Sequence, residues 1–104
     1  MAITSKRLCH GTLTDSTATL YTAPSSTGAK TIIKALALCN AGAVAVTVTL
    51  KLAGTAIYSE YSLDAHESIT IGQLDQILEA GELIEGLASA AASIKYYITG
   101  KELT

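Results

Sequence analysis

Residues 43–52 alternate strictly between large apolar and small or polar side chains, and this pattern constrains the fold more than any other part of the sequence. One face of the alternation is entirely aliphatic and consists of Val44, Val46, Val48, Leu50 and Leu52. The other face carries Ala43, Ala45, Thr47, Thr49 and Lys51. A period of two over such a length is typical of a β-strand with one face in a core and the other towards solvent. We therefore expect the chain to build its core between β-sheets.

Further runs of β-favouring residues follow at short intervals. Residues 31–39 are apolar on both faces apart from Lys34, which predicts a strand covered on both sides. Because Asn40-Ala41-Gly42 tolerates the positive φ of a tight turn, residues 31–39 and 44–52 are expected to form a hairpin. The other predicted strands cover residues 8–13, 17–22, 55–63, 67–72, 82–88 and 93–100.

Only residues 73–80 show helical spacing. Leu74, Ile77 and Leu78 fall on one helical face, and Gly81 follows where a C-cap glycine belongs. We therefore predict one short helical turn near residues 73–80. With seven to eight short strands separated by turn residues, the predicted fold is all-β, a single antiparallel β-sandwich or jelly roll.

The length of the chain favours a single domain. A chain of 104 residues has the usual size of one domain and buries enough surface for a core without metal or disulfide cross-links. The expected boundaries are an N-terminal arm, residues 1–7, and a β-sandwich domain, residues 8–104. We expect no signal peptide and no membrane-spanning segment, because the sequence shows no apolar run of the length that either needs.

Composition excludes several classes of function. The chain is 49% hydrophobic, which argues against disorder, and its net charge of −2 gives no basic excess for nucleic acid. No phosphate-binding loop, zinc-protease motif, paired CxxC or nucleophile elbow occurs, so we expect no enzyme and no cofactor. Cys9 and Cys39 are expected to be free and buried thiols; a disulfide formed after release from the cell and a reactive thiol are the alternatives.

Two short clusters carry groups capable of chemistry. Cys9 and His10 are adjacent on a predicted strand and therefore point to opposite faces, so we expect no metal site there. Asp64, His66 and Glu67 lie in a predicted turn. They are interpreted as turn residues, with a divalent-ion site or an acid–base pair as the alternative.

Charge and tyrosine positions suggest an interface. Residues 1–51 have a balance of +4, residues 52–94 of −7 and residues 95–104 of +1. A basic patch of one subunit can meet the acidic patch of the next, or the two can cancel within one folded chain. Tyrosines combine an apolar body with a polar tip and suit interface edges. The candidate interface residues are Lys6, Arg7, Lys30, Tyr58, Glu60, Glu79, Glu82 and Tyr97.

Several segments resemble small structural proteins of tailed bacteriophages. The resemblance lies in Leu20-Tyr21-Thr22-Ala23-Pro24, in residues 30–40 ending at Asn40, in Val46-Thr47-Val48, and in residues 78–89 and 98–102. It covers roughly residues 18–102. One departure is the Ser-rich loop 24–28, where a glycine is expected after the proline. The resemblance implies a virion component with a β-sandwich fold.

The expected function follows from this resemblance and from the missing catalytic motifs. It is that of a non-enzymatic structural subunit of a tailed-phage virion, assembled in the bacterial host cytoplasm. Such a subunit would self-associate as a homo-oligomer, or dock on other virion proteins of a symmetric head or tail. A capsid-decoration or tail-tip module that binds a host surface glycan through Tyr97 or Tyr58 is the alternative. A small hydrolase or metal-dependent enzyme using His66 is a further one.

Overall fold

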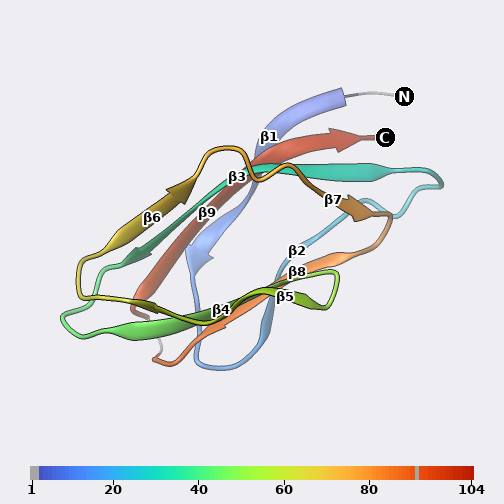
Figure 1. Ribbon diagram of the computed structural model, residues 1–104. Helices are drawn as coiled ribbons and strands as arrows, with labels where there is room; N and C mark the ends of the chain where they lie inside the picture. Colours follow the sequence, from blue (N-terminus) through green and yellow to red (C-terminus); the bar gives the residue numbers. More distant parts are fainter. Residues whose placement is uncertain (1–2, 91) are drawn as a thin grey trace.

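The computed structural model describes residues 3–90 and 92–104 and contains nine β-strands (Figure 1). No helix occurs among these residues, and so none that is long and apolar enough to cross a membrane. The strands are β1 (Ile3–Thr12), β2 (Ala18–Thr22), β3 (Lys30–Asn40), β4 (Val46–Leu52), β5 (Thr55–Leu63), β6 (Ser68–Ile71), β7 (Gln76–Glu79), β8 (Leu83–Ala88) and β9 (Ile94–Leu103).

The strands form two antiparallel sheets that pack face to face as a β-sandwich. The first, sheet A, has the order β1-β9-β3-β6, and β7 pairs with β3 further along the same edge. The second, sheet B, has the order β2-β8-β4-β5. Figure 1 shows sheet A above sheet B, with both ends of the chain at one end of sheet A. There Ile3 of β1 lies opposite Leu103 of β9.

The predicted alternation is confirmed over Val46–Leu52, because alternate side chains enter the space between the sheets. Val44, predicted on the same buried face, lies before the strand and is 65% exposed. Val46, Val48 and Leu50 are buried, while Thr47 and Thr49 lie on the outer face of sheet B. Strand β3 faces them from sheet A with Ile33, Leu36 and Leu38. The core is thus aliphatic, and Tyr21, Tyr58 and Tyr96 pack at its margins.

The predicted hairpin between residues 31–39 and 44–52 is wrong. Strands β3 and β4 belong to different sheets, and the segment between them crosses from one sheet to the other. The Asn40 side chain holds this crossing: its amide donates to the Val44 and Leu63 carbonyls, at 2.8 and 3.1 Å, and its oxygen accepts the Gly42 N–H at 2.9 Å. Because Asn40 is fully buried, its side-chain amide cannot form hydrogen bonds with water, and these bonds satisfy it instead.

The predicted helical turn near residues 73–80 is also wrong. Residues 76–79 form strand β7, which pairs with the first residues of β3. Leu78 enters the core and Ile77 points outwards. The two side chains therefore lie on opposite faces of the sheet and not on one face of a helix. Gly81 adopts a φ of 78° in the turn between β7 and β8, where a left-handed conformation is needed without a helix before it.

The N-terminal residues lie in regular structure from Ile3 onwards. Residues 3–7, expected as an arm, continue β1 and pair with residues 99–103 of β9. A bulge follows, at which Leu8 and Cys9 both turn towards the core. The bulge separates an exposed half of β1 from a half that packs on the sandwich.

Candidate interaction surface

The outer face of sheet A, which points away from sheet B, carries most of the exposed functional groups. Directly paired residues of antiparallel strands share a face, so the register fixes which side chains meet there. One row runs His10, Tyr97, Ala37, Thr70 across β1, β9, β3 and β6. The next row runs Thr12, Lys95, Cys39, Ser68.

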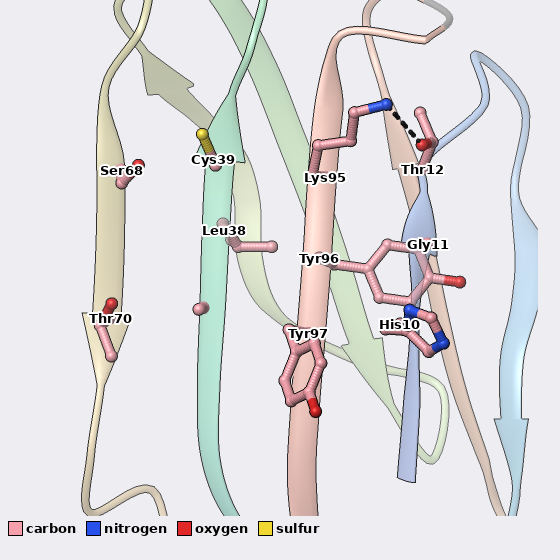
Figure 2. Close-up of a pocket in the computed structure, with 11 residues that line it drawn as sticks. His10, Gly11, Thr12, Leu38, Cys39, Ser68, Thr70, Lys95, Tyr96 and Tyr97 are labelled. Carbon is pink, nitrogen blue, oxygen red and sulfur yellow. Dashed lines mark hydrogen bonds between the residues drawn. The ribbon is translucent and has the colours of Figure 1, made fainter. Parts of the chain in front are cut away.

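These two rows line a shallow groove of about 470 Å³. Figure 2 shows the contributing strands side by side, with Ser68 and Thr70 on one flank and His10 and Thr12 on the other. The floor is low at Ala37, because a methyl group stands between larger neighbours on the adjoining strands. Lys95 crosses towards β1 and donates to the Thr12 hydroxyl at 3.0 Å.

Tyr97 is the largest side chain of the groove and is 46% exposed. The guanidinium carbon of Arg7 lies 5.8 Å from its ring centroid, within the range of a cation–π contact. The imidazole of His10 lies at the same centroid distance with its plane tilted by 50°. Arg7 and His10 both belong to β1, so both contact the ring from the β1 side. Ala37 is the neighbour of Tyr97 on the β3 side.

A second feature of this face is a group of outward apolar residues in two neighbouring rows, the terminal patch, formed by Ile3, Ile32, Ile77 and Leu103. Ile3 lies opposite Leu103, and Ile32 lies opposite Ile77, all on outward positions of four neighbouring strands. Ile3 is 67% and Ile77 57% exposed. The patch is separated from the groove by the row Arg7, Thr99, Ala35.

Several candidate interface charges pair within the chain. Lys30 bonds Glu79 across β3 and β7, and Lys34 bonds Asp75 next to them. Lys6 approaches Glu102 at 3.5 Å. At Lys30–Glu79 and Lys34–Asp75 the basic first half and the acidic middle segment therefore pair within one subunit, as the second of the two charge hypotheses predicts for these positions.

The other predicted interface residues are spread over the molecule. Tyr58 is half-buried against the core at the edge of sheet B, beside Tyr61 at a centroid distance of 5.5 Å. Glu60 has a positive φ of 51° at a bulge in β5, and its N–H donates to the Thr49 hydroxyl. Glu82 accepts the Glu79 N–H at 2.6 Å and so stabilises the turn between β7 and β8. The structure does not bring these residues together with Arg7 and Tyr97.

The cysteines lie on opposite faces of sheet A. Cys9 points inwards, where burial raises the pKa of its thiol to about 11. Cys39 points outwards into the groove. They sit on β1 and β3 with β9 between them, so two strand spacings, at least about 9.6 Å, separate them. This exceeds the reach of a disulfide, and both are free thiols.

The structure places the two clusters that carry groups capable of chemistry as follows. Cys9 and His10 point to opposite faces, as predicted. In the turn at residues 64–67 it is the Glu67 carboxylate that accepts the Asp64 N–H, at 2.9 Å, while His66 takes a positive φ of 60°. No group of three His, Cys, Asp or Glu residues within residues 3–90 and 92–104 could hold a metal ion.

Sequence reasoning missed the groove and the terminal patch. Both assemble from strands far apart in the chain, so no local motif marks them. A usable indication was the outward Ala35 and Ala37 of β3, whose small size leaves a hollow wherever large residues flank them.

Comparison with known proteins identifies the fold. No protein-family model and no curated protein sequence matches the chain. A solved structure described as "Bacillus endospore appendages form a novel family of disulfide-linked pili" is similar over 98% of this chain and 88% of its own, with a TM-score of 0.54 and 18% identity. The structure of infectious bursal disease virus Gt strain has a TM-score of 0.45 and 11% identity, over 96% of this chain and 31% of its own. The likeness to the pilus protein shows a shared β-sandwich fold.

Proposed function

We propose that this chain is a non-enzymatic structural subunit that assembles with copies of itself or with other proteins of a tailed-phage virion. The observation that carries the proposal is the terminal patch. Two apolar pairs, Ile3–Leu103 and Ile32–Ile77, lie in neighbouring rows of one outward face, and Ile3 and Ile77 are more than half exposed. Exposed apolar side chains gathered on one face are typical of protein–protein contact sites.

The position of the terminal patch suits assembly of a rigid unit. It lies on regular strands of sheet A, so its side chains are already ordered and lose little conformational freedom on association. Lys30 and Lys101 lie opposite Leu103 and Ile32, between the two apolar pairs, and Glu79 lies opposite Lys30. The patch thus combines apolar and charged side chains, as specific interfaces do.

Two similarities support this proposal. The fold is shared with a protein of disulfide-linked Bacillus endospore pili, and segments of the sequence resemble small virion proteins of tailed phages. The phage resemblance supports a location in the virion, with assembly in the host cytoplasm. A disulfide through the outward Cys39 would have to join two subunits, because Cys9 lies on the opposite face.

Light scattering coupled to size exclusion tests self-association. The wild-type chain is expected to form an oligomer that persists at about 0.5 M salt, where charge interactions are screened within a few ångströms. Ile77→Lys is expected to weaken the association at least tenfold. Val44→Lys is the control: Val44 is 65% exposed, beyond the opposite end of β3, and should leave association unchanged.

The same experiment has outcomes that contradict the proposal. A wild-type chain that stays monomeric at its highest soluble concentration, with and without reductant, overturns self-association. An oligomer that Ile77→Lys and Ile3→Ser leave intact overturns the assignment to the terminal patch. An oligomer that only reductant dissolves would place the contact at Cys39.

A further inference from the structure

We propose that the groove on the outer face of sheet A binds a carboxylated sugar chain. Tyr97 provides the stacking surface, and Lys95 and Arg7 bind the sugar carboxylates. This function is separate from self-association, because the terminal patch lies at the other end of the same sheet beyond the row Arg7, Thr99, Ala35.

The width of the groove fits a single oligosaccharide chain. Tyr97 and Thr70 stand on β9 and β6 with Ala37 of β3 between them, so they are two strand spacings or about 9.6 Å apart. A volume of about 470 Å³ falls within the usual range of small-ligand sites. The floor of the groove consists of paired residues of four hydrogen-bonded strands, and one side of it lies where these strands begin or end.

The Tyr97 ring, which provides the stacking surface, is held by its neighbours. Arg7 and His10 contact the Tyr97 ring from β1. On the β3 side, Tyr97 lies opposite Ala37, whose small side chain leaves room for a sugar ring beside the tyrosine. Since a tyrosine ring held by its neighbours has little freedom left to lose, stacking costs less conformational entropy.

The charges and hydroxyls of the groove select the class of ligand. Lys95 lies within the groove and Arg7 directly beside it, whereas none of the eleven lining residues is a carboxylate. An anion is therefore attracted without a competing internal partner. The hydroxyls of Ser68 and Thr70 line the other flank and can donate to or accept from sugar hydroxyls. One aromatic ring and two cations on a chain of net charge −2 suit a sparsely charged sugar better than a polyphosphate.

Titration calorimetry with the full chain tests this proposal. The probes are tetragalacturonate, a hyaluronan tetrasaccharide and a sialic acid dimer, with methyl-esterified tetragalacturonate as the uncharged counterpart. At least one acidic probe is expected to bind with a Kd below about 1 mM and more tightly than its ester. Tyr97→Ala is expected to weaken binding at least tenfold, and Lys95→Gln to remove the preference for the acid over the ester. Tyr61→Ala, an exposed tyrosine of sheet B, is the matched control.

A second variant guards against loss of folding. Ala37→Leu fills the floor of the groove from an outward position and should abolish binding while thermal unfolding stays unchanged. Binding of none of the three acidic probes overturns the proposal. Equal loss in Tyr61→Ala and Tyr97→Ala, or equally tight binding of a poly-aspartate peptide or a thymidine oligonucleotide, overturns it too. Self-association of each variant is measured alongside, so a failure here is distinguishable from a failure of the structural role.

Discussion

The hydroxyl of Tyr21 on β2 donates a hydrogen bond to the carboxylate of Glu102 on β9, and this bond joins the two sheets of the sandwich. The Thr31 hydroxyl lies 3.3 Å from the same Tyr21 oxygen. Lys6 approaches the other carboxylate oxygen of Glu102. A half-buried polar cluster thus closes the end of the core near the chain termini.

Tyr21→Phe removes the donor from this cluster while keeping the ring. The Glu102 carboxylate is only 16% exposed, so it loses a bond that water replaces poorly. The expected loss of unfolding free energy is about 1–3 kcal/mol. Urea denaturation measures it, and Tyr61→Phe on the exposed side of β5 should change the free energy by less than about 0.5 kcal/mol. Equal stability of the two variants would mean that the bond contributes nothing.

Stability is expected to fall in alkaline solution. Burial and the hydrogen bond to Glu102 raise the pKa of Tyr21 from 10.0 to about 12, and burial raises the pKa of Cys9 from 9.0 to about 11. Burial also raises the pKa values of Tyr58 and Tyr96. The folded state therefore holds these protons more tightly than the unfolded state does.

The sign of the pH effect follows directly. The stabilisation is complete below pH 9 and is lost as the pH rises through 11 and 12. Thermal unfolding followed from pH 8 to pH 12 should show a falling midpoint, and Cys9→Ala should flatten the part between pH 9 and 11. A midpoint that rises over this range would contradict the direction of these pKa shifts.

Gly100 is the position where added volume costs most. A Cβ at this buried residue would lie 2.1 Å from the Ile32 carbonyl oxygen and 3.0 Å from a methyl group of Leu8. Because β1, β3 and β9 meet there, the backbone has to move, and Gly100→Ala should cost about 2 kcal/mol or more. Gly72→Ala is the matched control, since its Cβ meets no atom within 4 Å. Comparable urea midpoints for the two variants would contradict the close packing of these strands.

The sequence alone could predict the strands better than their partners. The alternation of β4 is a local pattern, and burial between two sheets follows from it. Strand β3 pairs with β6, β7 and β9, all of which lie far along the chain. The sequence near Asn40 therefore could not reveal that β3 and β4 lie in different sheets. At residues 73–80, pairing with β3 and burial of Leu78 override a helical spacing supported by only three apolar residues.

The candidate surface shows the same limit. Strand alternation places Tyr96 and Tyr97 on opposite faces. In the structure Tyr96 packs against the core and Tyr97 is exposed. The groove beside Tyr97 depends on Ala37 and Thr70, which reach it only through the register of four strands. The charge balance along the chain could not tell whether Lys30 and Glu79 pair within one subunit or between subunits. Their pairing within one subunit depends on β7 lying next to β3, which the sequence did not predict.

Exchange of the charges at Lys30 and Glu79 distinguishes an ion pair within one subunit from a contact between two subunits. The side chains are about half exposed, so the pair should contribute less than about 1 kcal/mol to stability. Lys30→Glu alone places two carboxylates side by side and should lower the urea midpoint slightly. The double exchange Lys30→Glu with Glu79→Lys should restore it, because the pair is rebuilt within the same chain. If the contact instead joins two subunits head to tail, Lys30→Glu will break the oligomer, and both the double variant and an equimolar mixture with Glu79→Lys subunits will re-form it. If the contact lies within one subunit, the mixture of single variants will not restore the urea midpoint. Light scattering on the single variants, the double variant and the mixture decides between the two.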